Sequence, residues 1–222
     1  MVLTCEHASM ALPFGWTWPD DDRWVVGTHW SYDPGVASVV RALASHNGWG
    51  AVLAGFSRLV VDPNRDLDSA TLFRLEAEGR PLALNAELDD RRRAERIETL
   101  YRPYHQRVHE AVRDEPGATV LSMHSFTPVY EGQPRSMEIG VLFDVDEGPA
   151  RALASTLEAA GYNIALNEPY SGREGLMYAA QAPATRLGRR ALELELRQDL
   201  LEDAAWVERL VTVLSEAIPR HA

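Results

Sequence analysis

Apolar and polar positions divide this chain into short strand-like runs that alternate with longer helix-like stretches. The strand-like runs are mostly continuous in their apolar character, which is typical of strands buried on both faces of a sheet. They occupy residues 2–5, 51–54, 58–61, 119–123, 138–143, 162–166 and 190–196.

Four stretches carry apolar residues at the spacing of an amphipathic helix. They cover residues 34–46, 87–113, 149–160 and 203–218. Asp33 followed by Pro34 predicts a cap and a proline in the first helical position of the first stretch. Pro103 is expected to kink or interrupt the long second helix, because proline has no amide hydrogen to donate.

The alternation of strands and helices predicts an α/β fold with a mixed, mostly parallel central sheet flanked by helices on both faces. We find no internal repeat, low-complexity tract or linker in the 222 residues. A chain of this length accommodates one well-buried core. The prediction is therefore a single domain that spans residues 1–222.

The formal net charge of −11 argues against nucleic acid as a partner, because duplex binding requires a basic surface. The single cysteine excludes an intrachain disulfide and a thiolate zinc cluster. No apolar run approaches the roughly 20 residues needed to span a bilayer, and the first residues lack the pattern of a signal peptide. We therefore expect a cytoplasmic protein with no membrane partner; the sequence does not specify an oligomeric state.

Polar residues gather where the predicted strands end. Ligands of open α/β sheets bind at the carboxyl ends of strands, so these side chains are expected to meet at one rim. They are Glu6, His7, Asp62, Asn64, Arg65, His124, Ser125 and Glu195.

Two of these residues, His7 and His124, follow apolar runs directly and are predicted to hold a divalent metal ion, most simply zinc. Each histidine taken alone is equally well explained as a strand-terminal residue bonded to a nearby carbonyl group. Asp33 is the expected third ligand, although it also suits a helix cap. Glu6 is the reserve, because adjacent side chains on an extended segment point to opposite sides.

The segment 192–196 alternates strictly between leucine and glutamate, so Glu193 and Glu195 share one face of a strand. Two carboxylates within a covered sheet are costly unless they face a cleft or a cation. Glu195 is accordingly the candidate general base that activates the attacking water. An edge strand with one solvated face is the alternative.

The turn 62–66 and the loop 167–172 supply the candidate substrate-binding groups. An arginine fork beside an amide suits a substrate carboxylate, which assigns Arg65 and Asn64 to binding, with Arg58 nearby. Pairing of Arg65 with Asp62 or Asp66 is the alternative. Tyr170 and Ser171 are further binding candidates, although turn chemistry explains their loop equally well. We predict no role for His29.

Several motifs occur together in a fixed order along nearly the whole chain. They are Thr4-Cys5-Glu6-His7-Ala8-Ser9, Tyr32-Asp33-Pro34-Gly35, Arg58-Leu59-Val60-Val61-Asp62-Pro63-Asn64-Arg65, Tyr101-Arg102-Pro103-Tyr104-His105, His124-Ser125-Phe126, Asn167-Glu168-Pro169-Tyr170-Ser171-Gly172 and Glu195-Leu196-Arg197. In this ordered set the sequence resembles the N-formylglutamate amidohydrolase family.

The resemblance implies a zinc-exopeptidase-like (phosphorylase/hydrolase-like) fold, related to the zinc carboxypeptidase and aspartoacylase group. It implies a zinc-dependent amidohydrolase for a small anionic N-acyl amino acid such as N-formylglutamate. Asn64 and Arg65 would bind the α-carboxylate, Glu195 would be the base, and Arg58 or Tyr170 would stabilise the oxyanion. The wider group draws a carboxylate ligand three residues after the first histidine; Met10 stands there in this chain.

Two other hypotheses remain open from the sequence. A metal-independent hydrolase would use Ser125 or Cys5 as its nucleophile, and it would resist chelators. A carboxylate-binding module of the same fold would bind ligand without turnover.

Overall fold

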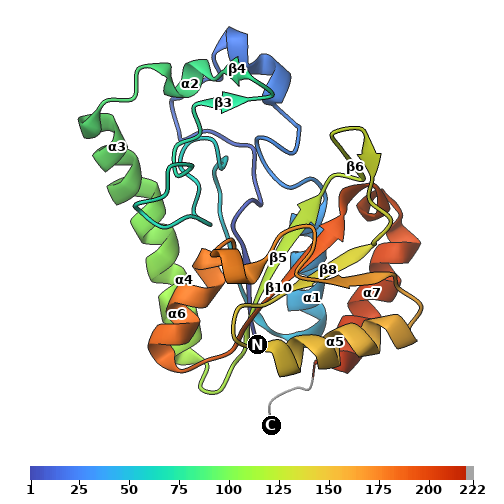
Figure 1. The fold of residues 1–222 in the computed structure, drawn as a ribbon. Coiled ribbons are helices and arrows are strands. Elements are labelled where there is room, and N and C mark those ends of the chain that lie inside the picture. The colour runs from blue at the N-terminus through green and yellow to red at the C-terminus, as the bar shows by residue number, and fades with distance from the viewer. Residues whose placement is uncertain (219–222) are drawn as a thin grey trace.

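Residues 1–218 of the computed structural model form a six-stranded sheet with helices on both faces (Figure 1). This confirms the predicted fold class, while the predicted domain end at residue 222 lies outside the described residues. In order across the sheet, the strands are β2 (Gly50–Leu53), β1 (Val2–Cys5), β5 (Val120–Phe126), β10 (Ala191–Arg197), β8 (Ile139–Leu142) and β9 (Ile164–Leu166).

The sheet is mixed, with one change of direction between its parts. Strands β2, β1, β5 and β10 are parallel to one another, whereas β8 runs antiparallel to β10 and parallel to β9. The carboxyl ends of the four parallel strands therefore lie at one edge, where the loops that follow them meet.

Helices cover the two faces unequally, as Figure 1 shows. Helices α1 (Val36–Asn47), α5 (Glu147–Ala159) and α7 (Ala204–Ala217) pack on one face. Helices α4 (Arg102–Asp114) and α6 (Tyr178–Leu187) pack on the other. Leucines at alternate positions of β10 join the first core, so Glu193 and Glu195 point toward the face of α4 and α6.

Above the strand ends, the chain folds into a cap of short elements around a third apolar cluster. The cap contains the 3₁₀ helix η1 (Asp20–Val25), the pair β3 (Glu76–Ala77) and β4 (Arg80–Pro81), and α2 (Ala83–Ala86). Trp18, Trp24 and Trp30 pack against this cluster. The remaining short elements are the hairpin strands β6 (Val129–Tyr130) and β7 (Gln133–Pro134), and the 3₁₀ helices η3 (Gly172–Glu174) and η4 (Gln198–Glu202).

The predicted strand at 58–61 is wrong: these residues form a turn. The Leu59 amide donates to Ser57 Oγ, and the Val60 amide donates to the Ser57 carbonyl. Both amide hydrogens therefore bond within the turn and are not available to a neighbouring strand. Leu59 and Val61 are apolar because they enter two different cores.

The long helix predicted at 87–113 is interrupted as expected. It begins as α3 (Asp90–Arg96), passes through the π-helical turn η2 (Ile97–Tyr101) and continues as α4. The Asp89 side chain caps α3. The π-turn lies immediately before Pro103, which cannot donate to the preceding turn.

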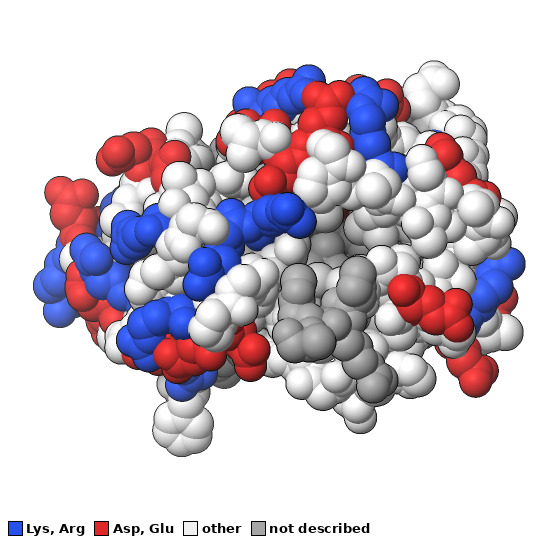
Figure 2. Space-filling model, turned by 90° about the horizontal axis from the view of Figure 1, so that it is seen from below, with Lys and Arg blue, Asp and Glu red and all other residues white. Residues whose placement is uncertain are grey.

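Charge is mixed on the surface. On the face in Figure 2, arginine side chains are interspersed with acidic ones and do not form one continuous basic stripe. Within residues 1–218, no helix is both long and apolar enough to cross a membrane.

Gly140 in β8 permits the close approach of the loop that carries Tyr170. A Cβ at this position would clash with the carbonyl oxygen of Glu168 and lie 3.3 Å from Cβ of Glu195. Only glycine leaves room for the loop to pass over the strand beside Glu195.

Replacement of Gly140 by alanine is expected to lower the free energy of unfolding by about 1–3 kcal/mol, because backbone must shift to admit the methyl group. Chemical denaturation measures this change. The matched control is Gly50→Ala in β2, where a Cβ meets nothing within 4 Å. Equal unfolding free energies for the two variants would contradict the close approach.

Candidate active site

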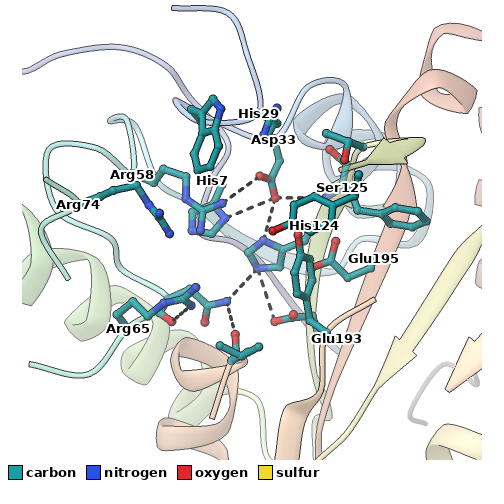
Figure 3. A pocket seen from close by; sticks show the side chains of 17 residues that line it. His7, His29, Asp33, Arg58, Arg65, Arg74, His124, Ser125, Glu193 and Glu195 are labelled. Atoms are coloured by element: carbon teal, nitrogen blue, oxygen red, sulfur yellow. Dashed lines mark hydrogen bonds and ion pairs between the residues drawn. The ribbon is translucent and has the colours of Figure 1, made fainter. Parts of the chain in front are cut away.

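Side chains from β5, β10 and several loops near the strand ends surround one pocket at the edge of the sheet (Figure 3). The pocket has a volume of about 240 Å³. Eight of the nine predicted site residues line it: His7, Asp33, Arg58, Asn64, Arg65, His124, Tyr170 and Glu195.

Of the two histidines in the pocket, one lies in a loop and the other in a strand. His7 follows β1, whereas His124 lies inside β5, which runs three residues beyond the predicted end at 123. The longer strand results from continuous pairing with β10, which places His124 opposite Glu195. The sheet therefore holds the His124 backbone rigidly.

Asp33 faces the two histidines and does not cap the first helix. Helix α1 begins at Val36 after Gly35, without a side-chain cap, so the predicted capping role and the helical position of Pro34 are wrong. The amide of Asp33 instead donates to the His7 carbonyl, and its Oδ2 accepts from the Ser125 amide. These bonds turn the carboxylate into the pocket.

The atoms that converge are Oδ2 of Asp33 and Nδ1 of both imidazole rings. The oxygen lies 2.9 Å from Nδ1 of His124 and 3.4 Å from Nδ1 of His7. Each of the three residues offers a ligand atom within 4.8 Å of the others, and all three side chains are buried. His7 Nδ1 has no hydrogen-bond partner among residues 1–218.

A second carboxylate stands behind each ring. Asp62 Oδ1 is 2.8 Å from Nε2 of His7, and Glu6 Oε2 is 2.9 Å from Nε2 of His124. Because an ionised carboxylate only accepts, each Nε2 carries a hydrogen, so Nδ1 is the ring atom left to hold either a proton or a metal ion beside Asp33. Two lone pairs and a carboxylate directed at one point fit a divalent cation, with nitrogen and oxygen donors that suit zinc.

Glu6 lies behind His124 and is not part of the group that could hold a metal ion. Its two oxygens accept from Tyr104, Ser122 and His124 at 2.7, 2.6 and 2.9 Å. Burial by itself would raise the pKa of Glu6, but these bonds and the charge of His124 lower it to about 2. Glu6 stays ionised and orients the His124 ring.

The electrostatic field at His124 favours positive charge. Burial by itself would lower the pKa of His124, but Glu193, Asp33 and Glu6 raise it well above the ordinary value. A proton or a metal ion at this ring satisfies the same carboxylates.

Glu193 and Glu195 lie together on the predicted shared face of β10. Both are buried, and Oε2 of each has no hydrogen-bond partner in residues 1–218. Burial raises the pKa of both carboxyl groups, that of Glu195 well above its usual range. The alternative of a solvated edge strand is excluded, since β10 pairs on both sides.

Two of the predicted binding residues, Arg58 and Asn64, already bond to other protein groups through their side chains. Arg58 already pairs with Asp62 at 2.9 Å and with Asp33 at 3.5 Å. Asn64 donates to the Leu176 carbonyl and accepts from the Ala179 amide, so it links the turn 62–66 to the start of α6. These contacts hold the pocket wall together.

Tyr170 lines the pocket, whereas Ser171 does not. The Ser171 hydroxyl accepts from the Arg173 amide and caps η3, which is the turn chemistry that the sequence offered as the alternative. Arg65 has no carboxylate within 4.0 Å in the described chain, so the alternative pairing with Asp62 or Asp66 is not formed.

The sequence reasoning assigned no binding or catalytic role to six residues that line the pocket: His29, Trp30, Arg74, Thr127, Tyr130 and Leu176. His29, Trp30 and Arg74 come from the part of the chain around the cap, where no predicted strand end marked them as rim positions. Asp62 was predicted to lie at the rim but was given no role at His7, and Tyr104 was named only within a motif, although they orient His7 and Glu6.

The two candidate nucleophiles have unsuitable surroundings. Cys5 is fully buried, and burial raises its pKa, which suppresses the reactive thiolate. The Ser125 hydroxyl donates to the Pro34 carbonyl at 3.1 Å. Neither has the adjacent activating base that a nucleophilic hydrolase requires.

Comparison with known proteins gives a consistent set of similarities. The family model described as N-formylglutamate amidohydrolase matches residues 1–202. A gene product of Agrobacterium tumefaciens is 32% identical, with a TM-score of 0.87 over 97% of this chain and 87% of that one. N-formylglutamate amidohydrolase from Ralstonia eutropha is 21% identical and shares the fold, with a TM-score of 0.63 over 97% and 92%. No curated protein matches this sequence.

Replacement of Glu6 by glutamine is expected to weaken zinc binding about 10- to 100-fold, because the charged acceptor behind His124 is lost. Competition with a chromophoric chelator measures the affinity, and circular dichroism verifies the fold. Glu158→Gln, at an exposed position of α5, is the control. Equal affinities for the two variants would remove Glu6 from the metal centre.

Proposed function

Because this chain belongs to the N-formylglutamate amidohydrolase family, we propose that its pocket hydrolyses the amide bond of an N-acyl amino acid in a zinc-dependent reaction. N-formylglutamate is the proposed substrate. The observation that carries the proposal is the convergence of His7, Asp33 and His124 beside the buried carboxylates of β10. A binding protein without chemistry does not need a second buried carboxylate, Glu195, beside the one that pairs with His124, Glu193.

His7, Asp33 and His124 would hold the ion, with Asp62 and Glu6 fixing the two rings. The chemistry that a divalent ion supplies there is Lewis acidity, which polarises a carbonyl and acidifies water. The protein contributes the geometry, because each ring is locked by a carboxylate on the side remote from Asp33.

Glu195 is proposed to move the proton. Its carboxylate would accept a proton from the attacking water and later deliver it to the nitrogen of the leaving amino acid. Burial favours the protonated state of this group, which suits the delivery step. The unpartnered Oε2 atom leaves a position free for that proton.

Arg65 is proposed to bind the substrate α-carboxylate, while Asn64 positions this arginine through its bonds to the start of α6. Arg65 is itself held by Thr71 Oγ1 and the Asn64 carbonyl. Tyr170, which also lines the pocket, is the proposed donor to the developing oxyanion. Arg58 is less suited to that role, because its guanidinium group already pairs with Asp62 and Asp33.

Loss of the metal ligands should abolish both binding and catalysis. His7→Ala and His124→Ala are expected to lose bound zinc, as seen by elemental analysis, and formate release from N-formylglutamate. His46→Ala, at the exposed end of α1, should retain both. Full turnover after exhaustive chelation would instead favour a metal-independent hydrolase.

Removal of the proton acceptor should separate binding from chemistry. Glu195→Gln is expected to retain zinc but to lose about 10²- to 10⁴-fold in kcat. Steady-state kinetics and metal analysis on the same preparation test this. Wild-type kcat in Glu195→Gln, with a large loss in Glu193→Gln, would transfer the role to Glu193.

A further inference from the structure

Cationic and anionic side chains occupy different walls of the pocket. Figure 3 shows Arg58, Arg65 and Arg74 on one side of the histidines, with Glu193 and Glu195 on the other. The cationic wall is notable in a chain with a net charge of −11. Such a concentration of arginine suits an anionic ligand.

The three arginines differ in how their charge is neutralised. Arg58 pairs with Asp62 and Asp33, so its positive charge is already compensated. Over residues 1–218, no carboxylate oxygen lies within 4.0 Å of the Arg65 or Arg74 guanidinium nitrogens. Two positive charges on this wall therefore remain without a protein counterion.

Of the three arginines, Arg74 has the fewest polar contacts from its side chain within the described residues. Within the described chain its guanidinium group makes no hydrogen bond, and it lies 5.3 Å from the centre of the Trp30 ring. Burial lowers the pKa of Arg74, and the charges of Arg58 and Arg65 lower it further. Its donors are thus available at a half-buried position among like charges, which an anion would stabilise.

The backbone of Arg74 is nevertheless fixed. Its carbonyl accepts from Asn85 Nδ2 at 2.7 Å, and the same amide nitrogen donates to the Leu59 carbonyl. Arg96 donates to Asn85 Oδ1 at 2.6 Å. An anchored backbone with an open guanidinium group is the arrangement expected of a ligand-binding side chain.

We propose that Arg74 is a specificity-determining residue that binds a second carboxylate of the substrate. This rests on the proposed function, in which Arg65 takes the α-carboxylate. The substrate is then an N-acyl derivative of an acidic amino acid, and Arg74, instead of the compensated Arg58, distinguishes it from neutral analogues.

The test compares two substrates of nearly equal size, N-formyl-L-glutamate and N-formyl-L-glutamine. Arg74→Gln should lower kcat/KM for the glutamate substrate about 10- to 100-fold, mainly through KM, because a charge-assisted contact is lost. The value for the glutamine substrate should change less than about threefold. Arg74→Lys should restore part of the discrimination, and Arg107→Gln, exposed on α4, should behave as wild type.

Equal losses for the two substrates would assign Arg74 a structural role, and unchanged discrimination would place it outside the binding site. Either result overturns the proposal. If the wild-type protein hydrolyses neither substrate, the proposed function fails, and calorimetric titration of the zinc-loaded protein with L-glutamate and L-glutamine still decides the subsite. Selective weakening of L-glutamate binding in Arg74→Gln supports it; equal binding of both amino acids overturns it.

Discussion

The structure depends on the way in which buried carboxylates hold two imidazole rings. Glu6 and Asp62 accept from Nε2 of His124 and His7, which leaves both Nδ1 atoms directed at Asp33. The three buried carboxylates of Glu6, Asp33 and Asp62 can all stay ionised only if positive charge lies among them. Arg58 supplies part of that positive charge through its pairs with Asp33 and Asp62, and the proposed metal ion would supply the rest.

The arrangement also explains why the polar face of the sheet is tolerated. Thr4, Glu6, Ser122, His124 and Glu193 occupy positions that would carry apolar residues in a purely structural sheet. Tyr104 on α4 reaches this layer with its hydroxyl group and so joins a packing helix to the site. The apolar layer on the other face of the sheet, under α1, α5 and α7, supplies hydrophobic stabilisation.

The alternation of apolar runs was sufficient to predict the α/β class, because buried parallel strands have a strong local signature. The ordered motifs likewise led to the family that the match over residues 1–202 confirms. Strand ends predicted His7 and His124 as neighbours. The cap could not be predicted, because the sequence of its turn at 58–61 resembles that of a strand. The place of Arg74 in the pocket was hidden as well, because Asn85 and Trp30, which contact it, come close to it only in the tertiary fold. The behaviour of Asn64 was equally hidden, because its partners lie more than a hundred residues away.

Asn64 has a mechanical consequence. A single short amide spans the gap between the turn that carries Asp62 and Arg65 and the residues that open α6. Asn64 is itself buried, so displacement of this turn relative to α6 would break both hydrogen bonds away from bulk water. The pocket wall that carries Asp62 and Arg65 is thereby mechanically coupled to the helix that begins at Tyr178.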